Sequence, residues 1–208
     1  MPQKDDVVAG VDEVGRGALA GPVVACACVL SAQCHKSKGR FRVTGIQNLW
    51  IADSKALSPN ERQESALWLT ENTHYGIGVV SQEFVDAKGI VRATEEAMKQ
   101  ALERLQKKIS VTSLLVDGRD KFHFSVPHQS IVRGDALEPS IAAASILAKV
   151  FRDSLMHRAG SVFPIYGFSE HKGYGTEEHR TAIIQHGPCV LHRKTFLKNL
   201  FEEQLEML

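Results

Sequence analysis

The sequence predicts an α/β fold, because short apolar runs that suit strands alternate along the chain with longer segments of helical periodicity. No internal repeat interrupts this order. The chain has 208 residues, 43% of them hydrophobic, which is enough for one globular domain with a real core. The formal net charge of +1 argues against a histone-like binder.

The apolar runs predict the strands of a sheet. A short turn joins the first two runs, which favours an antiparallel pair. The predicted strands are Val7–Val11, Val23–Leu30, His74–Val80 and Val111–Val116, and Ile131 with Val132 form a further short one.

Helical periodicity and composition predict the helices. Pro59–Thr70 and Val91–Lys107 repeat apolar residues at helical spacing, and Pro139–His157 is rich in small residues that let a helix pack closely on a sheet. Glu177 to the C-terminus is predicted to be mostly helical. The intervening segments are predicted to be a polar loop, Ser31–Asn48, and a glycine-punctuated loop, Phe163–Thr176.

The segment GVDEVGRGALAGP, residues 10–22, places Asp12 and Glu13 at the end of the first strand. Two charges at the end of a buried strand need compensation, which a divalent cation supplies. Because side chains alternate along a strand, we expect the chain to leave strand geometry near Glu13. Gly15 and Gly17 permit such a turn and let backbone N–H groups approach an anion. On these residues alone, a hairpin turn with two solvated acids is an equal alternative; a dinucleotide loop does not fit, because a strand follows.

Asp117 and Asp135 repeat the pattern of Asp12, since each stands beside a glycine where an apolar run ends. Taken singly, each such pair is typical of a turn. Together with Asp12 and Glu13 they predict a cluster at one edge of the sheet, where ligand sites of α/β folds collect. Oxygen ligands without histidine or cysteine favour Mg²⁺ or Mn²⁺ over zinc.

Other features limit the class of protein. No stretch reaches the apolar length of a membrane span and the N-terminus lacks a signal pattern, so we expect a cytoplasmic protein. Cys26 and Cys28 alternate along a strand and are expected to pack as small hydrophobes. The segment from Ala142 to Leu200 contains eight Lys or Arg but only four Asp or Glu. This basic excess suits a polyanionic substrate, although a solvated surface is the simpler explanation.

Several long motifs, in this order along the chain, closely resemble bacterial ribonuclease HII. They are GVDEVGRGALAGPVV (residues 10–24), DSKALS (53–58), Asp117-Gly118, RGDALEPSIAAASILAKVFRD (133–153) and YGFSEHKGYGT (166–176). The resemblance implies a ribonuclease H-like mixed five-stranded sheet flanked by helices. It also implies a catalytic domain over residues 1–175 and a C-terminal helical extension over residues 176–208, packed on the same domain.

The resemblance implies an endoribonuclease that hydrolyses the RNA strand of RNA–DNA hybrids. It would also cut 5′ of single ribonucleotides in duplex DNA, leaving 3′-hydroxyl and 5′-phosphate ends. Two metal ions about 4 Å apart would activate water and stabilise the leaving oxygen. By this match the metal-binding and catalytic residues are Asp12, Glu13, Asp117 and Asp135.

The same resemblance implies how the substrate is bound. Gly15, Arg16, Gly17 and Tyr174 would contact the 2′-hydroxyl that distinguishes RNA from DNA. Lys55, Lys149, Lys172 and Arg16 would contact phosphates, although Lys149 could simply extend along its helix. Loop and helix-end packing is the expected role of His171, His179 and His192.

Two positions depart from the family pattern: Ala18 replaces a frequent proline, and Ala56 replaces a lysine that would contact phosphate. The segment Ser31–Asn48 is longer than usual. Arg16 and the short N-terminus argue against type HIII. Two rival classes are a resolvase or transposase-like nuclease, disfavoured by the Gly-Arg-Gly turn, and a non-catalytic nucleic-acid-binding module, disfavoured by the four acids.

The C-terminal residues Gln204–Leu208 read QLEML and resemble the short peptides that dock on a sliding clamp. The alternative is that Leu200, Phe201, Leu205 and Leu208 form the apolar face of a terminal helix. Both interpretations stay open. We expect a monomer that binds RNA–DNA hybrid and ribonucleotide-containing duplex DNA.

Overall fold

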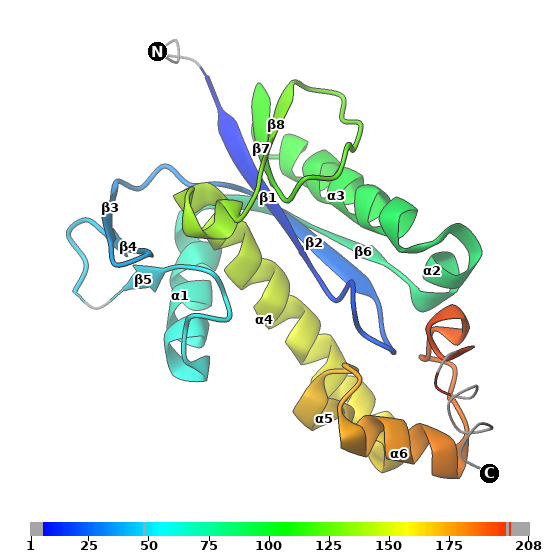
Figure 1. Ribbon diagram of the computed structural model, residues 1–208. Helices are drawn as coiled ribbons and strands as arrows, with labels where there is room; N and C mark the ends of the chain where they lie inside the picture. Colours follow the sequence, from blue (N-terminus) through cyan, green and yellow to red (C-terminus); the bar gives the residue numbers. More distant parts are fainter. Residues whose placement is uncertain (1–5, 48, 199, 201–208) are drawn as a thin grey trace.

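The computed structural model describes residues 6–47, 49–198 and 200. Its main sheet is mixed, since β1 runs antiparallel to β2 and parallel to β7 (Figure 1). β1 extends three residues beyond the predicted end, to Val14. In the order β6-β2-β1-β7-β8, the strands are β6 (His74–Val80), β2 (Val23–Val29), β1 (Val8–Val14), β7 (Ser113–Asp117) and β8 (His128–Ile131).

Strand β2 is buried along its whole length because helices cover both faces of the sheet. Its odd-numbered residues, Val23 to Val29, join the core that includes α3 (Ile90–Gln106). Its even-numbered residues, Val24 to Cys28, join the core that includes α4 (Pro139–Val162). A strand covered on both faces needs apolar residues at every position. Cys26 and Cys28 are therefore core hydrophobes, as predicted.

Small residues let both helices approach the sheet closely. At Gly78 in β6, a Cβ would collide with the backbone carbonyl of Ala97 in α3. At Gly10 in β1, it would collide with the backbone of Ser140 at the start of α4. The close approach brings the N-terminal half of α4 directly against β1, where the sequence carries Asp12.

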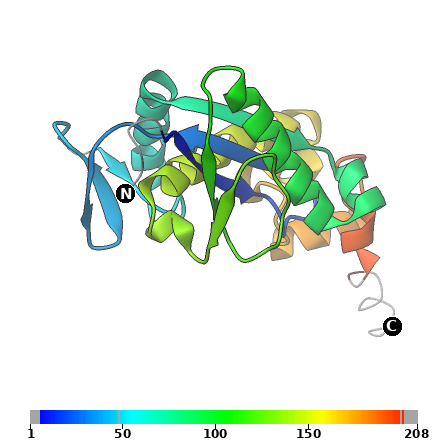
Figure 2. The same cartoon turned by 90° about the horizontal axis from the view of Figure 1, so that it is seen from above.

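The predicted polar loop Ser31–Asn48 is wrong, because most of this segment forms an antiparallel hairpin. β3 (Cys34–Ser37) pairs with β4 (Arg40–Val43), and β4 pairs with β5 (Trp50–Ile51) in a second, three-stranded sheet. Figure 2 shows this small sheet standing out at one side of the molecule. Phe41 and Val43 are buried while Arg42 between them is exposed, so the strand signal was a two-residue alternation hidden among polar residues.

Two further helices flank these sheets. α1 (Pro59–Asn72) begins with a capping box, in which Ser58 accepts a hydrogen bond from the Glu61 backbone while the Glu61 side chain accepts from Ser58. The second of them, α2 (Gln82–Lys88), was not predicted from the sequence. It is a short helix capped by Ser81 and followed by Gly89. Within the described ranges, no helix combines the length and apolarity needed to cross a membrane.

The part of the chain after α4 differs from the prediction. The expected loop Phe163–Thr176 contains a 3-10 turn η2 (Pro164–Tyr166) and a short helix α5 (Phe168–His171). Helix α6 (Glu177–His186) ends at Gly187, where φ is 72°, and Pro188 follows. From there to Leu197 the only helical element of the described chain is the 3-10 turn η3 (Lys194–Phe196), and His192 forms an isolated β-bridge with Ala20. The prediction of a mostly helical end is therefore wrong for this stretch.

This last part packs on the main body through a third apolar cluster. Met156 of α4 and Ala20 after the glycine turn belong to it together with Phe168, Ile183 and Leu197. This cluster contains residues from both sides of the predicted boundary between residues 175 and 176. The division into a catalytic domain over residues 1–175 and an extension over residues 176–208, packed on the same domain, stays a prediction.

Candidate active site

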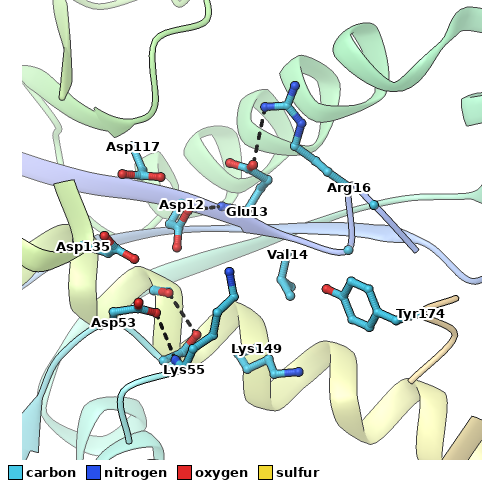
Figure 3. Close-up of a pocket in the computed structure, with 14 residues that line it drawn as sticks. Asp12, Glu13, Val14, Arg16, Asp53, Lys55, Asp117, Asp135, Lys149 and Tyr174 are labelled. Carbon is cyan, nitrogen blue, oxygen red and sulfur yellow. Dashed lines mark hydrogen bonds and ion pairs between the residues drawn. The ribbon is translucent and has the colours of Figure 1, made fainter. Parts of the chain in front are cut away.

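A cavity of about 400 Å³ opens where β1, β7, α4 and the loop after β5 meet (Figure 3). Ten of the eleven residues assigned from the sequence line it. The lining consists of Asp12, Glu13, Val14, Gly15, Arg16, Gly17, Asp53, Ser54, Lys55, Asp117, Asp135, Ser145, Lys149 and Tyr174.

The register of the sheet places two of the acids side by side. Val11 of β1 pairs with Val116 of the parallel strand β7, so Asp12 and Asp117 are the next residues on neighbouring strands. Contrary to expectation, the chain keeps strand geometry through Glu13, because Glu13 pairs with Ala25 in the ladder with β2. Both carboxylates nonetheless line the same cavity.

The other two acidic side chains come from short irregular segments. Asp135 lies in the 3-10 turn η1 (Gly134–Ala136), which is tied to β7 because the Gly134 N–H donates to the Asp117 carboxylate at 2.7 Å. Asp53 follows β5, and its carboxylate accepts a 2.9 Å hydrogen bond from the backbone N–H of Lys55. Burial, followed by the charges of Asp53 and Asp117, raises the pKa of Asp135.

The acids on β1 are buried and close to like charge. Burial, followed by the charges of Glu13 and Asp117, raises the pKa of Asp12 well above its ordinary value. Burial is also the main cause that raises the pKa of Glu13 to about 7. Arg16 opposes this shift only in part, since its guanidinium lies 3.6 Å from Glu13 but 2.6 Å from Asp120. The cavity therefore carries negative charge without a full counter-charge.

This donor set fits a divalent cation in its chemistry. It offers carboxylate oxygens from Asp12, Glu13, Asp117, Asp135 and Asp53, the ligands that Mg²⁺ and Mn²⁺ prefer. In the part of the chain that the structure describes, however, no group of three or more His, Cys, Asp or Glu side chains is arranged to hold one metal ion. Binding would thus require these side chains to turn toward the ion.

Two buried arginines, Arg152 and Arg193, hold the glycine turn beside the acids in place. Gly15 has φ 94°, and a Cβ there would collide with the side chain of Arg152 in α4. Arg152 donates to the carbonyls of Pro22, Ala20 and Lys172 at 2.9–3.1 Å. Arg193 donates to the Arg16 carbonyl at 2.8 Å and twice to the Gly21 carbonyl.

Tyr174 faces the cavity from a loop that is also anchored to the glycine turn. The Leu19 N–H donates to the Gly173 carbonyl at 2.8 Å, and the Tyr174 ring lies 5.3 Å from the Arg152 guanidinium. Below the loop, His179 Nδ1 donates to the Tyr174 carbonyl at 2.9 Å. Its Nε2 then accepts from His192 at 3.1 Å, so this buried pair packs and orients the loop, as expected for these histidines.

The predicted phosphate-binding lysines behave differently from one another. Lys55 and Lys149 line the cavity, and Lys149 forms an ion pair with Asp153 at 2.8 Å. Lys172 does not line it, because its ammonium donates to the carbonyls of Ser169 and Glu170 within its own loop. The structure thus brings all the predicted residues together except Lys172.

Some residues of the cavity and its support carry no strand-end signal and were not predicted as site residues. Ser145 lies inside a helix and contacts Ser54 at 3.2 Å, a contact that no local pattern indicates. Asp53 stood within a recognised motif, and its position before Ser54 and Lys55 was the available signal. Arg152 and Arg193 were counted only as basic residues, although both are fully buried.

Comparison with known proteins identifies the family. A family model described as ribonuclease HII matches residues 9–203. Over 191 residues the chain is 48% identical to a ribonuclease HII of Chlamydia muridarum, covering 91% of this chain and 81% of the relative. It is also 48% identical over 192 residues to a ribonuclease HII of Chlamydia pneumoniae, covering 91% of this chain and 83% of that relative. The predicted family is therefore confirmed.

Solved structures of lower identity share the fold. The structure of the PCNA:RNase HII complex from Archaeoglobus fulgidus matches with a TM-score of 0.68 and 23% identity over 90% of this chain and 93% of that chain. Ribonuclease H2 from Pyrococcus horikoshii OT3 matches with a TM-score of 0.66 and 22% identity, covering 94% of this chain and 97% of that chain. Bst-RNase HIII in complex with Mn²⁺ matches with a TM-score of 0.62 and 16% identity, covering 91% of this chain and 64% of that chain.

The predicted ribonuclease H-like fold is confirmed by these matches and by the mixed five-stranded sheet. The chain belongs to the ribonuclease HII family, a family of divalent-metal-dependent enzymes that hydrolyse RNA in RNA–DNA hybrids.

Proposed function

We propose that this enzyme cuts the phosphodiester on the 5′ side of a ribonucleotide within a duplex, including a single ribonucleotide embedded in DNA. The products would carry 3′-hydroxyl and 5′-phosphate ends. The observation that supports this proposal is the shared cavity, which joins five carboxylates to the Gly15–Arg16–Gly17 turn and Tyr174.

We propose that the cations are Mg²⁺ or Mn²⁺, held as a pair by Asp12, Glu13, Asp117 and Asp135. When bound, two such ions supply an activated water and charge stabilisation for the leaving oxygen. The protein's own contribution is to gather the carboxylates on β1, β7 and η1, and to partly bury them. We propose that no histidine acts as a base, because no described histidine lines the cavity. His179 and His192 are buried and already hydrogen-bonded to the loop and to each other.

Discrimination of RNA from DNA requires groups close to the sugar. Gly17 is exposed and has no atoms within 4 Å of the place a Cβ would occupy, so the turn presents open backbone to a substrate. Tyr174 stands on the same cavity and supplies a hydroxyl and a ring face. We propose that these groups read the 2′-hydroxyl and the sugar that follows it.

The direct test is cleavage of a DNA duplex that carries one ribonucleotide, with Mg²⁺ or Mn²⁺ and with EDTA. We expect one cut on the 5′ side of the ribonucleotide, which EDTA abolishes. An Asp117→Asn variant serves as the inactive control, and branched DNA without ribonucleotides tests the resolvase alternative. Cleavage of the branched DNA, or none of the ribonucleotide duplex, would overturn the proposal.

Tyr174→Ala separates the two substrate classes. Because stacking and a 2′-hydroxyl contact matter most at an RNA-to-DNA junction, we expect a larger loss on the single ribonucleotide than on a long hybrid. Base stacking of this kind contributes about 1–3 kcal/mol. Equal losses on both substrates would mean that Tyr174 only supports its loop.

We also propose that Gln204–Leu208 contact a sliding clamp. These residues lie outside the described part of the chain, and support comes from the QLEML sequence together with the archaeal relative in complex with PCNA. Deleting residues 204–208 should remove clamp binding in a pull-down while leaving cleavage of short duplexes unchanged. Absence of clamp binding by the intact protein would refute the contact.

A further inference from the structure

The hairpin formed by β3 and β4 is strongly basic. Between residues 31 and 52 the sequence contains no Asp or Glu. Lys36, Lys38 and Arg42 are exposed, and in the described chain no carboxylate lies within ion-pair distance of these three side chains. Unpaired cations gathered on one small element form a surface that attracts polyanions. We call residues 34–43 the basic hairpin.

The backbone of the basic hairpin is closed by a tight turn and is anchored at Arg40 and Phe41. Its two-residue turn has φ 50° at Lys38 and 77° at Gly39, as in the type I′ turns that match the twist of a tight hairpin. Arg40 is the exception among its cations, because it forms an ion pair with Glu61 at 2.7 Å and stacks 5.3 Å from the Trp50 ring. Phe41 is buried in the core beneath. The backbone that carries Lys36, Lys38 and Arg42 is therefore anchored, while their side chains extend into solvent.

The basic hairpin is continuous with the candidate active site. β4 pairs with β5, which ends at Ile51, and Asp53 begins the cavity-lining segment two residues later. In Figure 1 the small sheet lies on one side of the main sheet, and the chain runs from β5 back toward its centre. A duplex that enters the cavity and continues past Lys55 has the basic hairpin on that flank.

The side chains of the cavity alone, without bound cations, offer little attraction for a polyanion. Its carboxylates are incompletely compensated, and two of its cations are engaged, Arg16 with Asp120 and Lys149 with Asp153. Phosphate contacts outside the cavity would therefore add to the affinity for a duplex, because positive charge there releases counterions. Lys36, Lys38 and Arg42 are placed to supply them.

We propose that the basic hairpin binds the phosphate backbone of the substrate duplex, several nucleotides to one side of the cut. This inference rests on the proposed function and adds an accessory binding surface to it. The contact is independent of sequence, since lysines and an arginine reach phosphates rather than base edges. It anchors the duplex on one flank while the glycine turn and Tyr174 select the ribonucleotide.

The test compares two charge-matched variants. The first is K36Q/K38Q/R42Q, and the control is K88Q/R92Q/K107Q, which removes exposed cations from α2, α3 and the residue after it. Binding to a ribonucleotide-containing duplex is measured over a salt series in an Asp117→Asn background. For the hairpin variant we expect a severalfold higher Kd and a salt slope reduced by about 0.9 for each phosphate that the protein no longer neutralises. The control should match the parent.

Duplexes shortened from either end locate the binding surface. The difference between the hairpin variant and its parent should vanish when the duplex is trimmed on one side only. In active enzyme the same variant should raise KM more than it lowers kcat. Equal Kd and salt slope for the variant and parent would overturn the inference. Failure of the parent enzyme to cut the ribonucleotide duplex would instead overturn the proposed function.

Discussion

Arg193 donates a 2.8 Å hydrogen bond to the backbone carbonyl of Arg16 and two more to that of Gly21, so the C-terminal segment supports the turn that borders the candidate active site. The Arg193 side chain is fully buried, and in the described chain it has no carboxylate within ion-pair distance. Burial, followed by the charge of Arg152, lowers the pKa of Arg193 to about 10. The role of this buried guanidinium is therefore to donate hydrogen bonds to the carbonyls of Arg16 and Gly21.

Arg193→Lys is expected to damage both stability and activity. An ammonium keeps the charge but cannot reach two carbonyls with the geometry of a guanidinium. Each buried acceptor left unsatisfied costs about 1–3 kcal/mol. Thermal unfolding and cleavage of the single-ribonucleotide duplex measure the two effects, and Arg158→Lys on the exposed face of α4 is the control. Unchanged kcat in a destabilised variant would limit Arg193 to a structural role.

Gly15→Ala and Gly17→Ala form a pair with opposite expected outcomes. Gly15 has φ 94° and lies against Arg152, so alanine there should destabilise the protein by about 1–3 kcal/mol from backbone strain alone. Gly17 is exposed with open space around it, so alanine there should leave the melting temperature unchanged but hinder the approach of a sugar. A fully active Gly17→Ala enzyme would argue against substrate contact at this turn.

Asp12→Asn should abolish cleavage and, without divalent cations, stabilise the fold. The amide keeps the oxygen that accepts from the Glu13 N–H at 2.7 Å but removes the cost of burying an ionisable group beside Glu13 and Asp117. At neutral pH the melting temperature should rise, by about 2–4 °C for each kcal/mol gained in a chain of this size. Adding Mg²⁺ should stabilise the wild type more than the variant. An unchanged response to Mg²⁺ would remove Asp12 from the metal site.

His179 should make stability depend on pH below neutrality. Burial is the main cause that lowers its pKa from 6.5 to about 4 in the folded protein. Between pH 4 and pH 6.5 the unfolded chain binds a proton on this histidine and the folded protein does not, so acid favours unfolding. The contribution of the neutral His179 to stability is complete above pH 6.5 and is lost as pH falls toward 4. The loss amounts to about 3 kcal/mol. Denaturant unfolding at several pH values should show a flatter profile for His179→Gln, and identical slopes would contradict this origin.

The sequence predicted those features of the fold and the site that depend on residues close together in the chain. Asp12 and Asp117 each follow a buried apolar run, and the parallel register of β1 and β7 then makes them neighbours. Ser145 could not be found in this way, because its contact with Ser54 depends on how α4 crosses the sheet. The position of Lys172 outside the cavity was not predictable either, since its loop turns the ammonium onto the carbonyls of Ser169 and Glu170. Its contact with phosphate stays a prediction. The β3–β4 hairpin was hidden because only Phe41 and Val43 mark its buried face.

The bond between Arg193 and Arg16 also makes the glycine turn a non-local structure, since it joins residues 177 positions apart. The acids Asp12 and Glu13 lie on a strand next to this turn, but the donors for the carbonyls of Arg16 and Gly21 come from the segment after α6. Closing a loop of this length costs conformational entropy, so we expect the contact to form after the elements between the two segments have folded. The acids can therefore reach their strand before the turn beside them acquires its native support.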